Sequence, residues 1–142
     1  MPRVEVAHVV PADQDRVYQV LCDMERFPEY MPALESLKVL ERGDDYTITE
    51  WVARLQGARF RWVERDEFRP GRIDYRQLVG DLKTFEGWWS LEEAPEGGTE
   101  VTLVTDFEFG IPMLSALLNP VARVALRENS RSMLASIANR FA

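Results

Sequence analysis

Large aromatic residues alternate with charged residues in the middle of the chain. Phe60 and Trp62 share one phase of a strand-like run, whereas Arg59 and Arg61 occupy the other. A period of two is typical of a strand with one apolar face and one solvated face. The pattern therefore predicts a sheet with an aromatic inner face. Other aromatic pairs repeat it: Phe85 with Trp89, and Phe107 with Phe109.

Turn signals divide the chain from Leu34 to Phe109 into short runs. Brief connections of this kind join antiparallel neighbours in a sheet. With a first strand at Val4–Val10, the pattern predicts seven antiparallel strands. The turn signals are Gly43-Asp44, Gln56-Gly57, Pro70-Gly71, Gly80-Asp81 and the stretch from Pro95 to Gly98.

Two-residue turns at Gln56-Gly57 and Pro70-Gly71 set a register for the central strands. A three-residue loop from Gly80 to Leu82 then keeps Phe85 and Trp89 on the inner face. A slip of one residue would turn the arginines inward, so the register is strongly specified. The predicted inner-face pairs are Trp51 with Trp62, Thr49 with Glu64, Glu64 with Gln77, Asp66 with Tyr75, Phe68 with Ile73, and Trp62 with Val79.

Two short helices are expected between the first and second strands. Asp13 can cap the first helix, in which Val17 and Leu21 lie on one apolar face. Pro28 is suited to the first turn of the second helix, and Pro32 ends it.

The segment from Ile111 to Ala142 is predicted to be helical. Pro112 suits a first turn, and Pro120 predicts a kink or a short helix before the long one, because proline removes a backbone donor. An apolar stripe follows the helix: Ala122, Leu126, Ser130, Met133, Ile137 and Phe141.

These elements predict an α+β fold of the helix-grip type. Its curved seven-stranded antiparallel sheet wraps around the long C-terminal helix, because only this helix is long enough to cover the aromatic face. A length of 142 residues fits a single domain, 1–142.

The amino-acid composition limits the functions that the protein can have. The chain has 17 Lys and Arg against 24 Asp and Glu, a net charge of −7, which argues against nucleic acid and anionic membranes as direct partners. No run reaches the roughly 20 apolar residues of a membrane span, and no signal region precedes the first strand. We therefore expect a cytoplasmic protein.

Cys22 and His8 are single residues of their kind. With one cysteine, no internal disulfide can form, and one Cys with one His cannot build a usual zinc site. A Ser-His-Asp triad would depend on His8 alone. Cys22 lies in an apolar helical stripe, where a small buried thiol fits well. His8 shares the phase of Val4 and Val6, which predicts that it packs at the edge of the core. No metal and no cofactor are expected.

The aromatic inner face has two interpretations. The rings can fill a core, or they can form flat walls around a cavity for a planar or chain-like ligand. Small residues on the last helix, including Ala122, Ala125 and Ala138, leave room beneath it and favour the cavity.

Polar residues also share the inner phase: Thr49, Glu64, Asp66 and Gln77. An unpaired carboxylate is costly in an apolar setting, so these groups are solvated, paired in a hydrogen-bond cluster, or catalytic. In the catalytic interpretation, Glu64 or Asp66 acts as a general base and Tyr75 orients a carbonyl group.

Three segments in this order resemble the START-like, Bet v-like superfamily, and most closely its polyketide cyclase/dehydrase and coenzyme Q-binding branch, which includes RatA-like ribosome association toxins. The resemblance implies a deep cavity between the sheet and the last helix for a lipid, quinone, sterol or polyketide. The segments are Phe27-Pro28-Glu29-Tyr30-Met31-Pro32, Gly87-Trp88-Trp89-Ser90-Leu91 and Thr99-Glu100-Val101-Thr102-Leu103.

Two further segments resemble the aromatase/cyclases of that branch. Phe60-Arg61-Trp62-Val63 lies where they carry cavity tryptophans, and Asn129 lies where their last helix supplies a polar cavity residue. The chain departs from them at Asp66, where they place an inner-face arginine, and this departure counts against cyclase activity. We expect these residues to contact a ligand: Phe27, Tyr30, Trp51, Phe60, Trp62, Gln77, Phe85, Trp89, Phe107, Leu126, Asn129 and Met133.

Three functions are consistent with these patterns. The first is binding of a hydrophobic small molecule without a covalent step. The second is aldol cyclisation and dehydration of a polyketide in the same cavity. The third is a RatA-like contact with the ribosome, for which the outer-face arginines are candidates where acids do not pair with them. The sequence leaves a homodimer open.

Overall fold

The computed structural model describes the backbone of residues 1–110 and 112–142 and the side chains of residues 1–110 and 116–142. Its strands are β1 (Arg3–Val10), β2 (Leu34–Arg42), β3 (Tyr46–Leu55), β4 (Ala58–Arg69), β5 (Arg72–Val79), β6 (Thr84–Glu93) and β7 (Thr99–Glu108). Its helices are α1 (Gln14–Cys22), the 3-10 turn η1 (Met24–Arg26), α2 (Phe27–Tyr30) and α3 (Pro112–Asn139).

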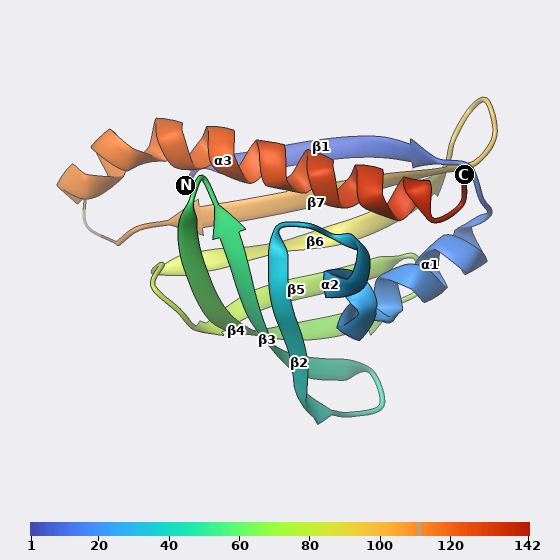
Figure 1. The fold of residues 1–142 in the computed structure, drawn as a ribbon, viewed down its shortest axis with the longest axis horizontal. Coiled ribbons are helices and arrows are strands. Elements are labelled where there is room, and N and C mark those ends of the chain that lie inside the picture. The colour runs from blue at the N-terminus through green and yellow to red at the C-terminus, as the bar shows by residue number, and fades with distance from the viewer. Residues whose placement is uncertain (111) are drawn as a thin grey trace.

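The strands form one antiparallel sheet of seven strands in the order β1-β7-β6-β5-β4-β3-β2. Figure 1 shows α3 running alongside β1 and β7, with β2 to β4 curving away and α1 and α2 at the end of the sheet near the C terminus. The α+β helix-grip fold predicted from the sequence is confirmed. Among the described residues, no helix has the length and apolar content needed to cross a membrane.

The turn between β3 and β4 sets the register that the sequence predicts. Gln56 and Gly57 have φ values of 52° and 80°, as a two-residue hairpin turn of type I′ requires. Trp51 therefore pairs with Trp62, and Thr49 with Glu64. Because the turn forces a non-glycine residue into the left-handed region, the hairpin carries local backbone strain at Gln56.

One predicted pair on the inner face is wrong. Glu64 pairs with Gln77 as expected, but an irregularity between Val63 and Glu64 pairs Val79 with Val63 instead of Trp62. Val79 is consequently 67% exposed. A bulge of this kind inserts an extra residue and changes the facing of the strand beyond it.

Helix α3 continues through Pro120, so the separate short helix allowed by the sequence is not formed within the described residues. The helix ends at Asn139, three residues before the predicted end, and the predicted start at Ile111 lies outside the described residues. The predicted apolar stripe is confirmed at Leu126, Met133 and Ile137, which are buried.

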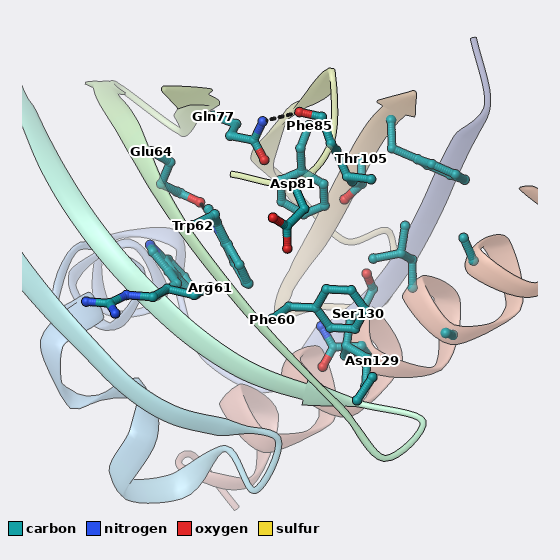
Figure 2. Close-up of a pocket in the computed structure, with 18 of the residues that line it drawn as sticks. Phe60, Arg61, Trp62, Glu64, Gln77, Asp81, Phe85, Thr105, Asn129 and Ser130 are labelled. Carbon is teal, nitrogen blue, oxygen red and sulfur yellow. Dashed lines mark hydrogen bonds between the residues drawn. The ribbon is translucent and has the colours of Figure 1, made fainter. Parts of the chain in front are cut away.

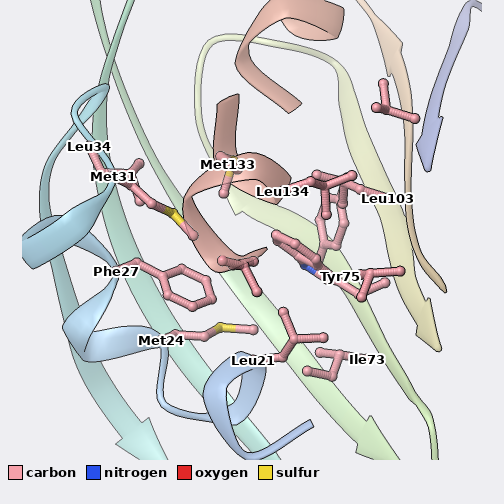
Figure 3. Close-up of a cluster of buried hydrophobic side chains, with 14 of the residues drawn as sticks. Leu21, Met24, Phe27, Met31, Leu34, Ile73, Tyr75, Leu103, Met133 and Leu134 are labelled. Carbon is pink, nitrogen blue, oxygen red and sulfur yellow. The ribbon is translucent and has the colours of Figure 1, made fainter. Parts of the chain in front are cut away.

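Helices α1 and α2 and the turn η1 cover one end of the core. Asp13 caps α1 by accepting a hydrogen bond from the backbone N–H of Arg16, as predicted. Figure 3 shows Leu21, Met24 and Phe27 pointing toward the centre of a buried apolar cluster. This end of the molecule is therefore solid core.

His8 lies differently from the expectation, whereas Cys22 agrees with it in part. His8 is exposed rather than packed at the edge of the core, because burial on its face of β1 stops at Val6 and resumes only at Val10. Cys22 packs against the core but is only half-buried. Partial burial still raises the pKa of its thiol, as desolvation disfavours a thiolate.

The solvated face of the sheet carries the predicted arginines, and several pair with acids. Arg59 Nε lies 3.0 Å from Glu35, and Arg61 lies 2.9 Å from Glu50. Arg72 lies 2.9 Å from Asp74 on the same strand. Such exposed pairs contribute little to stability, about 0 to 1 kcal/mol each.

Candidate functional site

A cavity of about 400 Å³ lies between the sheet and α3. Residues of β3, β4, β5, β6 and β7 form one wall, and residues of α3 from Leu118 to Met133 form the other. Figure 2 shows Trp62, Phe85 and Asn129 from different elements facing this space. The cavity reaches solvent at the exposed lining residues Phe60, Asp81 and Val121.

Aromatic rings form the sheet side of the cavity. The rings of Trp51 and Trp62 stack, with centroids 5.6 Å apart and an interplanar angle of 16°. Phe85 lies 5.4 Å from Trp62 at a tilted angle and continues the wall onto β6. The two indole rings stack because the hairpin register places Trp51 and Trp62 directly opposite each other.

Most of the residues expected to contact a ligand lie together at this cavity, although ligand contact itself stays a prediction. Phe27 and Tyr30 lie outside the lining. Phe27 is fully buried in the core, and its ring contacts those of Trp51 and Trp89 from behind the wall. The expected residues that line the cavity are Trp51, Phe60, Trp62, Gln77, Phe85, Trp89, Phe107, Leu126, Asn129 and Met133.

Glu64 brings a carboxyl group to the inner end of the cavity. It lines the cavity but is only 3% exposed. Trp62 Nε1 donates a hydrogen bond of 2.8 Å to Glu64 Oε1. Burial, the nearby charge of Asp66 and a hydrogen bond with Asp66 raise the pKa of Glu64 well above its ordinary value.

Asp66 lies behind Glu64 and does not line the cavity. Its side chain is fully buried, and Oδ2 accepts hydrogen bonds of 2.9 Å from Thr47 and 2.7 Å from Thr49. Burial raises the pKa of Asp66, and the hydrogen bonds from Glu64, Thr49 and Thr47 oppose that increase. The hydrogen-bond cluster considered from the sequence is thus present for Asp66, Glu64 and Thr49.

Tyr75 lines the cavity, but its hydroxyl group is hydrogen-bonded to residues of β7. It donates a hydrogen bond of 2.8 Å to the carbonyl oxygen of Val104 and lies 2.6 Å from Thr105 Oγ1. Gly87 makes this approach possible, because a Cβ there would lie 1.8 Å from the Val104 oxygen and 2.9 Å from the tyrosine hydroxyl. Burial raises the pKa of Tyr75, so it stays a neutral phenol.

Gln77 holds the loop between β5 and β6 beside the cavity. Its Nε2 atom donates a hydrogen bond of 2.6 Å to the carbonyl oxygen of Leu82, so Gln77 is not part of the Asp66 cluster. Asp81 and Leu82 of this loop line the cavity. Gly80 fits closely here, since a Cβ would lie 2.2 Å from Gln77 Oε1.

Helix α3 supplies the opposite wall and a link to the β3–β4 turn. Gln56 Nε2 donates a hydrogen bond of 3.0 Å to Glu128 on α3. Asn129 lines the cavity, and its Nδ2 atom lies 3.5 Å from the sulfur of Met133. Its buried Oδ1 atom has no hydrogen-bond partner among the described residues.

The chain matches a family model described as polyketide cyclase / dehydrase and lipid transport over residues 10–134. This protein belongs to that family. Among the described residues, no group of three or more His, Cys, Asp or Glu is placed to hold a metal ion.

The chain is also similar to solved structures and to other known sequences. The chain is similar to TTHA0849 from Thermus thermophilus, with 32% identity, a TM-score of 0.90 and coverage of 99% of this chain and 97% of the other. The Zhui aromatase/cyclase from Streptomyces sp. R1128 has 22% identity, a TM-score of 0.88 and coverage of 98% and 92%. The ribosome association toxin RatA of Vibrio cholerae is 24% identical over 115 residues, 80% of each chain.

The cavity of this polyketide cyclase / dehydrase family member also includes residues that the sequence patterns did not single out. Thr105 lies on the phase of Leu103 and Phe107, so the alternation along β7 could have revealed it. Asp81 and Leu82 come from a loop whose conformation has no period to follow. Outside the lining, Thr47 could have been found as the partner of Asp66 from the β3–β4 register.

Proposed function

We propose that this protein binds one hydrophobic small molecule, such as a lipid, an isoprenoid quinone or an aromatic polyketide, in the cavity between the sheet and α3. The observation that carries the proposal is the cavity of about 400 Å³ with stacked aromatic walls. Its size lies within the range of roughly 300–1,000 Å³ typical of small-molecule sites.

The chemistry of the lining supports an apolar guest. Flat rings such as Trp62 and Phe85 contribute large apolar area and favour planar or chain-like ligands. Apolar area removed from water stabilises a complex by about 25 cal/mol per Å². The exposed apolar residues Phe60 and Val121 at the mouth of the cavity would also be covered by a guest that extends outward.

A fluorescence titration with the neutral dye Nile red tests the proposal. Ala125 lines the cavity on α3, so we expect Ala125→Phe to fill the space and weaken dye binding by at least about ten-fold. Val124 is the matched control, because it is 56% exposed on the same helix and Val124→Phe leaves the cavity unchanged. Equal binding by the two variants would contradict the proposal.

Polyketide cyclisation is the second candidate function. Glu64 favours it, because a carboxyl group that faces the cavity and has a raised pKa is suited to proton transfer. Asp66 lies behind it, and the hydroxyl group of Tyr75 is already bonded to β7. If the protein is a cyclase, Glu64→Gln should remove turnover of a poly-β-ketone surrogate while the circular dichroism spectrum stays unchanged.

A ribosome contact is a third candidate, supported by the similarity to RatA. Arg61, which also lines the cavity, and Arg72 are both paired with acids, which lowers the positive charge available for such a contact. Co-sedimentation with ribosomal subunits at physiological salt would support this candidate. The cytoplasmic location and a homodimer stay predictions from the sequence.

A further inference from the structure

Two buried carboxyl groups follow each other on β4 at the inner end of the cavity. Glu64 is 3% exposed and lines the cavity, whereas Asp66 is 0% exposed and lies behind it. Among the described residues, no salt bridge includes either group. Burial disfavours the charged form of each carboxyl group, and a second negative charge nearby disfavours it further, so we expect the pair to carry no more than one negative charge.

The hydrogen bonds show which carboxyl oxygens already have a donor. Asp66 Oδ2 accepts from the hydroxyl groups of Thr47 and Thr49, whereas Oδ1 has no partner among the N–H and O–H donors of the described residues. Glu64 Oε1 accepts from Trp62. One proton shared by the two carboxyl groups would leave the pair with one negative charge and would keep lone pairs of Glu64 available to a ligand in the cavity.

The neighbouring donors are also in use. Tyr75 donates to the Val104 oxygen, Gln77 to the Leu82 oxygen, and Trp51 to Thr49 Oγ1. This end of the cavity therefore offers acceptor lone pairs, above all at Glu64, and a net negative charge. Buried acceptors without a donor are costly, and a ligand that supplies a donor removes that cost.

We propose that Glu64 determines ligand specificity: the inner end of the cavity accepts a hydrogen bond from the hydroxyl group of a neutral hydrophobic ligand, a phenol or an alcohol. The same end excludes a ligand whose carboxylate would lie there, because a second negative charge would be placed beside the Glu64–Asp66 pair. This inference rests on the proposed function and adds the chemical class of the ligand.

Four naphthalene probes that differ in one substituent test the inference by displacement of Nile red. The probes are 2-naphthol, 2-methoxynaphthalene, 2-methylnaphthalene and 2-naphthoate. We expect the wild-type protein to bind 2-naphthol about ten-fold more tightly than the methyl and methoxy probes, which lack a donor. We expect 2-naphthoate to bind at least about ten-fold more weakly than 2-methylnaphthalene.

Variants assign these preferences to the carboxyl pair. Glu64→Gln keeps an acceptor in the cavity and a donor to Asp66, so the preference for 2-naphthol should persist. Glu64→Met removes the acceptor, and the affinities for 2-naphthol and 2-methylnaphthalene should become equal. The double variant Glu64→Gln with Asp66→Asn removes the charge, and 2-naphthoate should gain about ten-fold in affinity. Nile red binding shows that each variant retains a folded cavity.

The outcomes separate the two proposals. Equal affinity of the wild-type protein for 2-naphthol and 2-methylnaphthalene, or a preference that persists in Glu64→Met, overturns the inference alone. Unchanged exclusion of 2-naphthoate in the double variant assigns that exclusion to the apolar walls and overturns the role of the charge. Failure of the wild-type protein to bind Nile red and every neutral probe overturns the proposed function as well.

Discussion

Trp62 connects the aromatic wall of the cavity to its acidic end. Its ring stacks on Trp51 at 5.6 Å, and its indole N–H donates to Glu64. The register of one hairpin turn places all three side chains on the same face. At the scale of single residues, the apolar wall and the carboxyl pair are therefore one connected structure.

Replacing Trp62 tests that connection. Trp62→Ala removes the stacked ring and the donor to Glu64, so we expect unfolding free energy to fall by about 2–4 kcal/mol and Nile red affinity to fall at least about ten-fold. Trp88→Ala is the control, since Trp88 faces outward beneath Arg3 and Arg72. A similar loss of dye binding in both variants would show that the effect is not local to the cavity.

The raised pKa of Glu64 predicts a pH-dependent stability. The unfolded chain releases this proton near the ordinary value of 4.5, whereas the native protein keeps it to a higher pH. The stabilising contribution of neutral Glu64 is therefore complete below that value and is lost as pH rises through the native pKa. Relative to Glu64→Gln, wild-type stability should fall by about 1.4 kcal/mol per pH unit in that window.

Urea denaturation from about pH 5 to about pH 8 measures this difference. Glu86→Gln, at an exposed position on the solvated face of the sheet, is the control and should run parallel to the wild type. Parallel curves for Glu64→Gln and the wild type would mean that folding takes up no proton at Glu64.

At the scale of elements, the close pairing of β6 with β7 at Gly87 lets the Tyr75 hydroxyl group reach its hydrogen-bond partners on β7. A Cβ at Gly87 would lie 1.8 Å from the Val104 oxygen. We expect Gly87→Ala to reduce the free energy of unfolding by at least about 2 kcal/mol, because neither strand can move without breaking the ladder. Thermal denaturation measures this loss.

The neighbouring residue provides the control for Gly87. Glu86 is exposed on the same strand, so Glu86→Ala should change stability by no more than about 0.5 kcal/mol. If Gly87→Ala unfolds at the same temperature as Glu86→Ala, the strands have more freedom than the structure indicates.

The sequence predicted the elements and the facing of most strands, since both follow from periodic patterns. Trp51, Trp62 and Phe85 were assigned to one wall because alternation and a two-residue turn determine their side. Val79 was misplaced because a bulge is a local irregularity without a periodic signal. The position of Asp66 behind Glu64, outside the lining, depends on packing depth, which alternation does not report.

At the scale of the whole molecule, the fold separates two faces with opposite character. The outer face carries arginines paired with acids, and the inner face encloses an apolar cavity under α3. Residues of α1, η1 and α2 fill the core at one end of the sheet. Gln56 on the β3–β4 turn donates a hydrogen bond to Glu128 on α3. This arrangement leaves the part of the inner face under α3 available to bind a ligand.

The proposed function depends on the binding of a hydrophobic small molecule in the cavity. Native mass spectrometry of the protein purified from its own cells tests it most directly. We predict one noncovalent adduct per chain, released on denaturation, and its absence from Ala125→Phe but not from Val124→Phe. An unliganded wild-type protein that also fails to bind Nile red, or an adduct of equal abundance in both variants, would contradict the proposed function.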